Sequence, residues 1–461
     1  MNSLQAGFAR VNVTPMLGIH VAGYYKERIA EGILDELEIN ALALRCAGTT
    51  LIILSMDVCE TGTDVCLRFR KHVEEATGVP ASNVFIHSTH THTGPVMEPY
   101  GDEEPLLAEY LQFVDHRMTE AAVMALQDLK PARMGFGIGR APGIAFVRRY
   151  VMKDGSVRTN PGVNNPDVVR PVGEPDERVN VLRFDQEGGK SLVLVNFGDH
   201  PDTVGGSKIS ADWPGFLRKR VEKALDNTRC IFLNGAQGDV NHVNVFPKGG
   251  DLNDMFMDFD DVSRGYGHAR HMGNVVAGAV LQVYDKVEWT DVSELHALSR
   301  TFMVPSNMPD PSELPLAHKY NDLHNAGKDD EIPFRGMMLT TVVAGAARMV
   351  ALEHGPASFS MTLSGLTVGP IAFVGIPGEP FTGIGRGLKA AEGWTLVLPV
   401  CLTNGSEGYF PMMDCYEEGG YETSGSRFKA GVAEIITDEG LELLRDMKRI
   451  LLPRSIREVE E

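Results

Sequence analysis

The sequence predicts an α/β fold with a mixed sheet at its core, helices on the flanks and long loops over the carboxyl ends of the strands. Short apolar runs rich in β-branched residues indicate buried strands, and segments with apolar residues at helical spacing lie between several of them. Two further runs alternate between apolar and polar residues, which indicates antiparallel strands. Strands that alternate with helices are typical of α/β proteins, and the alternating runs make the sheet mixed or add a second, stacked sheet.

The predicted elements follow one another along most of the chain. Buried strands are expected at residues 50–56, 84–87, 192–197, 230–233, 371–375 and 396–402. Alternating strands are expected at 38–45 and 295–303. Helices are expected at 64–76, 104–129, 213–225 and 438–452. Asp212 precedes Trp-Pro, so we expect its side chain to cap the third of these helices.

Three long stretches interrupt this pattern and are expected to be irregular. They are rich in Pro, Gly and charged residues, and they span residues 152–180, 247–267 and 305–336. The second contains the acidic run DMFMDFDD. Irregular segments of this length inside a compact domain are usually functional, so we interpret them as lids.

Composition limits the classes of partner. Of the 461 residues, 43% are hydrophobic and 23% are charged, as in ordinary globular proteins. The net charge of −19 disfavours nucleic acid and anionic membranes as partners. No apolar run has the length of a membrane span and no N-terminal segment resembles a signal peptide, so we expect a cytoplasmic protein. The six cysteines show no C-x-x-C pair, which favours reduced, buried thiols.

The loops that follow the buried strands carry most of the chemistry-bearing side chains. His90 and His92 follow the strand at 84–87, and His200 follows the strand at 192–197. Glu379 comes shortly after the strand at 371–375. Because ligands collect at the carboxyl ends of strands in α/β sheets, we expect these loops to converge on one site.

The residue types in these loops are those of a catalytic zinc site. In an extended segment, residues i and i+2 point the same way, so His90 and His92 can face one pocket. Two histidines and one carboxylate are typical ligands of a catalytic zinc and leave room for water.

Five segments, in a consistent order, resemble the neutral/alkaline ceramidases. They are FARVNVTPMLGIHVAGYY near the N-terminus, THTHTGP, NFGDH with SADWPG beyond it, PGEPFTGIGRGLK, and TNGSEGYFPMMDCYEEGGYE. Together they extend from Phe8 to about Glu422. The resemblance implies the catalytic domain of that family, a zinc ion, and hydrolysis of a linear N-acyl amide by metal-activated water.

The resemblance also implies individual roles. Four residues take the positions of the zinc ligands of the family: His90, His200, Glu379 and Tyr409. Three take the positions of its substrate-contacting residues: His92, Tyr421 and Arg140, the last within GRAP.

The chain departs from the family pattern in two places. The family has a catalytic serine in the loop before Gly-Asp-Val, where this chain has Gly235, and His242 is a speculative substitute. The chain ends about 40 residues after Tyr421, so we expect one catalytic domain over 1–461 without the C-terminal β-sandwich of the family.

Three classes of function remain open at this point. The first is a zinc-dependent amidase with a ceramidase-like site and a small-molecule amide substrate. The second is an ester or lactone hydrolase that uses the same zinc site. The third is a metal-binding homologue without activity, against which the intact set of predicted ligands argues. The sequence leaves homo-oligomerisation open.

Overall fold

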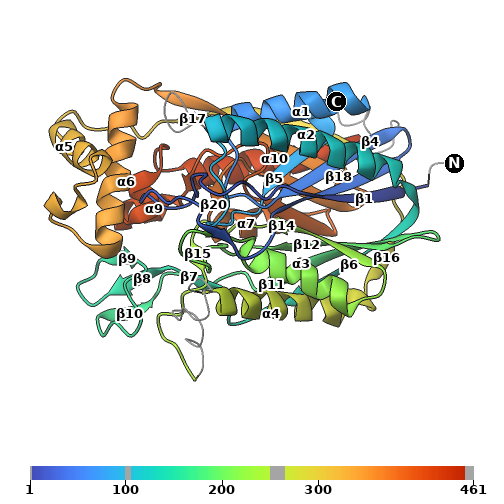
Figure 1. The fold of residues 1–461 in the computed structure, drawn as a ribbon, viewed down its shortest axis with the longest axis horizontal. Helices are drawn as coiled ribbons and strands as arrows, with labels where there is room; N and C mark the ends of the chain where they lie inside the picture. Colours follow the sequence, from blue (N-terminus) through green and yellow to red (C-terminus); the bar gives the residue numbers. More distant parts are fainter. Residues whose placement is uncertain (1–2, 99–104, 250–264, 452–461) are drawn as a thin grey trace.

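Two stacked β-sheets between layers of helices form the core of the protein (Figure 1). This computed structural model describes residues 3–98, 105–249 and 265–451. The α/β fold predicted from the sequence, with a mixed sheet and flanking helices, is confirmed.

The larger sheet has nine strands. Eight of them follow the order β14 (Thr228–Asn234), β12 (Ser191–Phe197), β11 (Arg178–Gln186), β6 (Lys130–Arg140), β1 (Gln5–Asn12), β3 (Glu38–Cys46), β4 (Thr49–Met56) and β5 (Val84–Ser88). The ninth, β16 (Glu288–Thr290), pairs with β6. Neighbouring strands are antiparallel except for two parallel pairs, β4 with β5 and β12 with β14. Each parallel pair is the outermost pair of the eight-strand path.

The smaller sheet has four strands and stacks against the larger one. Its order is β17 (Leu295–Pro305), β18 (Ser358–Val368), β19 (Ile371–Gly375) and β21 (Leu396–Val400). Only β19 and β21 are parallel. Side chains of both sheets share one buried apolar cluster, with Ile53 and Phe85 from the larger sheet and Leu366 and Phe373 from the smaller one. Burial of such a cluster is the main force that holds two sheets together.

Helices cover the outer faces of both sheets. Four helices cover the outer face of the larger sheet: in Figure 1, α1 (Thr63–Thr77) and α2 (Pro105–Gln127) lie at the top of the view, and α3 (Asp212–Ala224) and α4 (Tyr266–Tyr284) lie at the bottom. The first pair shares an apolar cluster with β1, β3, β4 and β5, and the second pair shares one with β11, β12 and β14. The smaller sheet is covered by α7 (Thr382–Lys389) and α10 (Val432–Leu451).

Eight further elements are short and lie outside the two main sheets. They are β2 (Gly32–Ile33), β13 (Lys208–Ile209), β7 (Phe146–Val147), β15 (Val240–Asn241), β20 (Glu379–Pro380), β22 (Tyr409–Phe410), α8 (Met413–Glu418) and α9 (Tyr421–Gly425). Two single turns of 3-10 helix, η1 (Ala81–Asn83) and η2 (Asp329–Glu331), are also present.

Most predicted elements match these bounds, but two details of the helices differ. The last helix begins at Val432, six positions before the expected start. The expected cap at Asp212 is wrong, because Ala211 is the N-cap residue and Asp212 lies inside α3 with a φ of +53°. The Asp212 carboxylate instead accepts hydrogen bonds from the backbone N–H groups of Thr203 and Val204, at 2.9 and 2.8 Å, and so fixes the loop before the helix.

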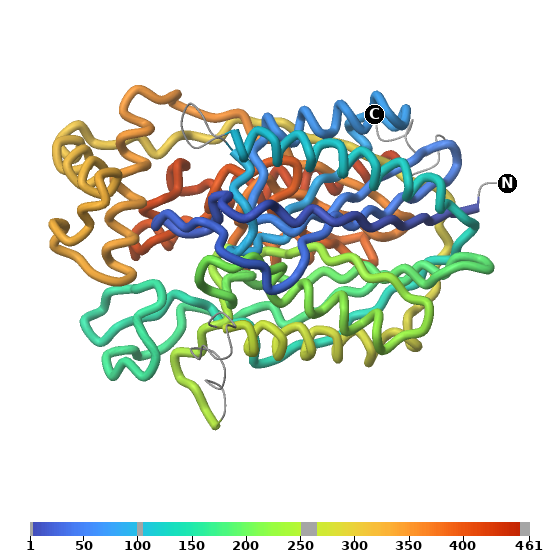
Figure 2. Tube along the Cα trace, viewed as in Figure 1, coloured from blue at the N-terminus to red at the C-terminus, as the bar shows by residue number. Residues whose placement is uncertain are grey.

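Two of the three stretches expected to be irregular contain regular structure. Residues 152–180 contribute β9 (Val157–Thr159) and β10 (Val168–Pro171), which pair with β8 (Arg149–Met152) in a small sheet. Residues 305–336 contain α5 (Leu314–Asn325), which packs against α6 (Gly336–Leu352). Figure 2 shows this helical hairpin at the end of the molecule farthest from the N-terminus. The acidic run DMFMDFDD of the other stretch, residues 247–267, lies outside the described residues.

Two further sequence interpretations concern burial. All six cysteines are buried, and none of them forms a disulfide. In the described part of the chain, none of the helices has both the length and the hydropathy that crossing a bilayer requires.

Candidate metal centre

The carboxyl ends of the parallel strands of the two main sheets lie together. The Asn234 side chain, at the end of β14, donates to the backbone oxygens of Thr89 and Asp199, which follow β5 and β12. Cys401, directly after β21, donates its backbone N–H to Asn234 O at 3.1 Å. The loops after β5, β12, β14 and β21 are therefore hydrogen bonded around one buried asparagine, as expected for strand ends in an α/β protein.

Each of two buried histidines is oriented by a hydrogen bond to the backbone. His90 Nδ1 lies 2.8 Å from Cys59 O, and His200 Nδ1 lies 2.9 Å from Gln237 O. A carbonyl oxygen can only accept, so Nδ1 carries a proton in each ring, and Nε2 of the neutral ring has the free lone pair. This is the arrangement that histidine ligands of metal ions usually show.

The two Nε2 atoms and one carboxylate oxygen face the same point. His90 Nε2 lies 3.3 Å from His200 Nε2, and Glu379 Oε2 lies 3.2 Å from each of them. All three residues are at most 5% exposed. Three lone-pair donors this close together repel one another unless a cation or a proton lies between them.

The separations suit a tetrahedral zinc ion. Ligand atoms about 2.0–2.1 Å from zinc in a tetrahedron are about 3.3–3.4 Å apart, because the tetrahedral edge is about 1.6 times the bond length. The three measured edges of 3.2–3.3 Å agree with that value. The donor set of two imidazoles and a carboxylate also fits zinc chemically.

The Tyr409 hydroxyl supplies a fourth potential ligand atom at this point. It lies on β22, which pairs in parallel with β20 so that Glu379 and Tyr409 are directly opposite in register. The Tyr409 hydroxyl is 3.5 Å from His200 Nε2. We call His90, His200, Glu379 and Tyr409 the ligand cluster.

The charges of the ligand cluster are mutually dependent. Burial lowers the pKa of His200, and the Arg148 charge acts in the same direction, so this ring is neutral. Burial opposes ionisation of Glu379, but His90 and His200 hold the pKa of its carboxyl well below the usual range. Burial also opposes protonation of His90, yet Cys59 and Glu379 raise its pKa well above the usual value. A positive charge is thus favoured at the point that the ligand cluster surrounds.

His92 and Tyr421, both expected to contact substrate, lie beside the ligand cluster. His92 Nε2 is 3.2 Å from His90 Nε2, and the Tyr421 ring centroid is 5.5 Å from that of Tyr409. Gly23 packs over the His92 ring, where a Cβ would lie 2.6 Å from His92 Cγ. Its φ of +101° is also one that side chains rarely adopt, so this position requires glycine.

Arg140, expected to contact substrate, lies elsewhere. It ends β6 on the surface, where its side chain is 73% exposed and pairs with Glu177 at 2.9 Å. It lines a separate cavity with residues 174–178 and Arg386. The interpretation of Arg140 as a residue of this site is therefore wrong.

Arg148, and not Arg140, is the arginine that lies beside the ligand cluster. It is buried, with NH1 3.5 Å from His200 Nε2 and its guanidinium carbon 5.3 Å from the Tyr409 ring centroid. Its Nε is 2.8 Å from an oxygen of Glu422, which is fully buried. The only sequence signal for Arg148 is a pair of arginines inside the apolar run AFVRRYVM.

The loop after β14 shows why glycine occupies position 235. A Cβ on Gly235 would lie 3.1 Å from the backbone nitrogen of Gly198, where the ends of β12 and β14 approach closely. His242 is buried, and its ring neighbours His268 at 5.9 Å rather than the ligand cluster. The structure therefore does not bring His242 to the site as a substitute for the serine of the family.

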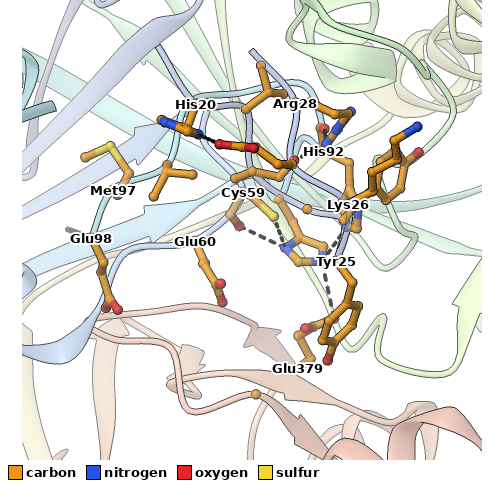
Figure 3. A pocket seen from close by; sticks show the side chains of 18 of the residues that line it. His20, Tyr25, Lys26, Arg28, Cys59, Glu60, His92, Met97, Glu98 and Glu379 are labelled. Atoms are coloured by element: carbon orange, nitrogen blue, oxygen red, sulfur yellow. Dashed lines mark hydrogen bonds and ion pairs between the residues drawn. The ribbon is translucent and has the colours of Figure 1, made fainter. Parts of the chain in front are cut away.

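Cys59 belongs to a second group of potential ligands that sequence reasoning missed. One ligand atom from each of Cys59, His90 and His92 lies within 4.8 Å of the others. The His90 Nδ1 that faces the Cys59 sulfur already bonds Cys59 O, whereas the atoms of the ligand cluster keep free lone pairs. Figure 3 shows Cys59 and Glu379 in different parts of the pocket. Because its Nε2 and carboxylate atoms are not used by other partners in this way, the ligand cluster fits a metal ion better than the group with Cys59.

Two cavities open onto the ligand cluster. The first cavity, of about 520 Å³, is lined by His92, Glu379, Tyr409 and Tyr421 together with residues 20–28, 59–60 and 96–98. The second cavity, of about 450 Å³, shares His92, Tyr409, Tyr421 and residues 23–26 with the first and adds Arg148 and part of α6.

Comparison with solved structures identifies the fold. The neutral ceramidase from Pseudomonas aeruginosa aligns with a TM-score of 0.71 at 16% identity, over 96% of this chain and 75% of the ceramidase chain. A ceramidase complexed with C2 aligns with a TM-score of 0.70, also at 16% identity, over 97% of this chain and 76% of the other. No protein-family model and no curated protein sequence matches the chain. The protein thus has a neutral ceramidase-like fold, as the sequence motifs predicted.

Proposed function

We propose that this protein is a zinc-dependent hydrolase that cleaves a linear N-acyl amide bond. The observation that carries the proposal is the buried triangle of His90 Nε2, His200 Nε2 and Glu379 Oε2, with edges of 3.2–3.3 Å. The ceramidase-like fold and the motif order support the amide as the bond that is cleaved.

The ligand cluster would hold the zinc ion through two imidazole nitrogens, a carboxylate and a phenolic oxygen. When bound, zinc supplies Lewis acidity that makes water nucleophilic near neutral pH and polarises a carbonyl group. The orienting hydrogen bonds from His90 and His200 to backbone carbonyls keep the ligand atoms in place between turnovers.

The neighbouring residues are placed to handle the two sides of an amide. Arg148 and Tyr421 line the second cavity and would orient the carbonyl and stabilise negative charge that develops on its oxygen. His92 lines both cavities, so its ring would hold the proton that the leaving amine needs.

Gly235 determines the nature of the nucleophile in this proposal. It has no hydroxyl group, and the close approach of Gly198 disfavours a side chain at this position. We therefore propose that water attacks the amide directly and that no covalent acyl-enzyme forms.

The proposal is tested by metal analysis and by a substrate panel. The purified protein should contain about one equivalent of zinc, and chelation should abolish hydrolysis that added zinc restores. Short N-acyl amides should be hydrolysed faster than an aryl ester or a lactone, relative to the uncatalysed rates. Full activity after complete removal of metal would refute the zinc dependence, and preference for the ester or lactone would refute the amidase.

We also propose that the protein acts in the cytoplasm as one catalytic unit. The six buried cysteines, none of them in a disulfide, support a reducing compartment. The ligand cluster draws on residues from position 90 to position 409, which supports a single unit. Cell fractionation tests the compartment, and limited proteolysis that releases an active fragment would contradict the single unit.

A further inference from the structure

The two cavities differ in the chemistry of their walls although both reach the ligand cluster. They share residues 23–26, which form a partition between them. Only the first cavity is lined by Glu60 and Glu98, and only the second is lined by Met337, Leu339 and Val343 of α6. An amide has an acyl side and an amine side, so two unlike cavities on either side of the metal centre offer a place for each.

The acidic wall of the first cavity has little compensating positive charge. Figure 3 shows Glu60 and Glu98 side by side, across the pocket from Tyr25 and Lys26. Among the described residues no hydrogen bond or ion pair to the Glu98 carboxylate occurs, and Glu60 accepts one from the Ser406 hydroxyl. Partial burial and the Glu60 charge raise the pKa of Glu98.

The nearby arginines are occupied by other partners. The Arg28 guanidinium donates to the carbonyl oxygens of Gly206 and His92, at 2.8 and 2.7 Å, and lies over the Tyr24 ring. Arg427 pairs with Glu407 at 3.0 Å. Neither arginine forms an ion pair with Glu60 or Glu98 in the described part of the chain.

The backbone leaves room for the Glu98 carboxylate at this place. A Cβ on Gly62 would lie 1.6 Å from Glu98 Oε1, so only glycine at position 62 permits this position of the side chain. The Glu98 carboxylate therefore lies directly over Gly62 at the wall of the cavity.

His92 indicates independently that a ligand enters between the two cavities. It is 7% exposed and lines both of them. Among the described residues none makes a hydrogen bond to its Nδ1, and Asp202 Oδ1 is 3.6 Å away. A buried ring nitrogen without a partner is costly, and a substrate group would satisfy it.

We propose that the substrate is an N-acyl amine whose amine side carries a second, protonated amino group. Glu60 and Glu98 bind this ammonium group in the first cavity, and the apolar acyl side of the substrate lies against α6 in the second cavity. This inference rests on the proposed amidase function and adds the substrate class. Carboxylates pair with an ammonium group most strongly where water is partly excluded, as inside this cavity.

The test compares three hexanoyl amides of similar length with zinc-loaded protein. They are the amides of 1,4-diaminobutane (cationic), pentylamine (neutral) and 5-aminopentanoate (anionic). We expect kcat/KM to be at least about 10-fold higher for the cationic amide than for the neutral one, and lowest for the anionic one. Glu98→Gln and Glu60→Gln should each reduce this preference, whereas Glu187→Gln, which removes the same charge on an exposed turn, should leave it unchanged.

A binding measurement keeps the inference testable if turnover is absent. Calorimetry should show that 1,4-diaminobutane binds the zinc-loaded protein more tightly than pentylamine does, and that Glu98→Gln weakens this binding about fivefold or more. Equal kcat/KM for cationic and neutral amides, with equal binding of the two amines, would overturn the inference and leave the amidase proposal intact. Hydrolysis of none of the amides, together with tight binding of the diamine, would overturn the amidase proposal instead.

Discussion

The ligand cluster and the walls of the two cavities are built in opposite ways. The two histidine rings of the ligand cluster are fixed by hydrogen bonds to backbone carbonyls, and His90, His200 and Glu379 are almost completely buried. The cavity walls carry exposed side chains such as Glu60, Glu98 and Tyr25, and they come from loops and from the α5–α6 hairpin. This difference indicates that the ligand cluster determines the reaction, whereas the walls determine the substrate.

The largest expected effect comes from breaking the ligand cluster. His200→Ala removes a buried ligand, so the variant should lose its zinc. Its kcat/KM should fall at least about 10³-fold, because the metal stabilises the charge of the transition state by several kcal/mol. Zinc content is measured by mass spectrometry of the purified protein. The control is His296→Ala, which changes a histidine of β17 that pairs with Glu294 and does not belong to the ligand cluster. This variant should keep both metal and activity. Full zinc content in His200→Ala would show that the ligand assignment is wrong.

The next largest effect tests Arg148, which lies between the ligand cluster and the walls. Removing this arginine alone leaves Glu422 with a weaker partner, Arg149 NH1 at 3.9 Å, and risks unfolding. The double variant Arg148→Met with Glu422→Gln avoids a buried unpaired charge. We expect kcat to fall about 10²-fold, because the change removes a donor that stabilises the negative charge on the carbonyl oxygen of the amide. The zinc content should stay near one equivalent.

Glu422→Gln alone is the matched control for that double variant. It keeps Arg148 and should therefore retain most of kcat. If KM rises and kcat is unchanged in the double variant, Arg148 contributes only to substrate binding and the role proposed for it would be incorrect.

A smaller effect is expected for the Tyr421 hydroxyl, which belongs to the walls. Tyr421→Phe keeps the ring that packs against Tyr25 and Tyr409 and removes one hydrogen-bonding group. We expect about a 10-fold loss in kcat/KM, equivalent to one hydrogen bond, and no loss of zinc. Steady-state kinetics and metal analysis check this, and loss of zinc in the variant would place Tyr421 among the ligands.

The smallest effect should follow from Arg140→Ala. This arginine forms an exposed ion pair with Glu177, and such pairs contribute at most about 1 kcal/mol to stability. We expect kcat/KM to change less than about twofold, as measured with the same amide substrate. A loss as large as that of the Arg148 double variant would restore Arg140 as a residue of the site.

The fold and most of the ligand cluster could be predicted because both depend on local sequence. Buried strands show as apolar runs, and the polar residues that follow them must meet where parallel strands end. His90, His200 and Glu379 were found in this way, and the motif order added Tyr409.

Arg148 could not be predicted because its environment is made by distant contacts. Arg140 and Arg148 follow one another closely in sequence, yet only the turn after β6 decides which one enters the interior. The partner that makes burial of Arg148 tolerable, Glu422, is 274 positions away. The regular structure within residues 152–180 and 305–336 could not be predicted for a similar reason. The strands β9 and β10 are stabilised by pairing with β8, and α5 is stabilised by packing against α6.

The most direct test of the central claim is X-ray absorption at the zinc edge of the zinc-loaded protein. The account predicts only nitrogen and oxygen neighbours at about 2.0–2.2 Å, two of them histidine nitrogens. It predicts the same spectrum for Cys59→Ser, because Cys59 is outside the ligand cluster. A sulfur neighbour at about 2.3 Å that disappears in Cys59→Ser would contradict the account and place the metal between Cys59, His90 and His92.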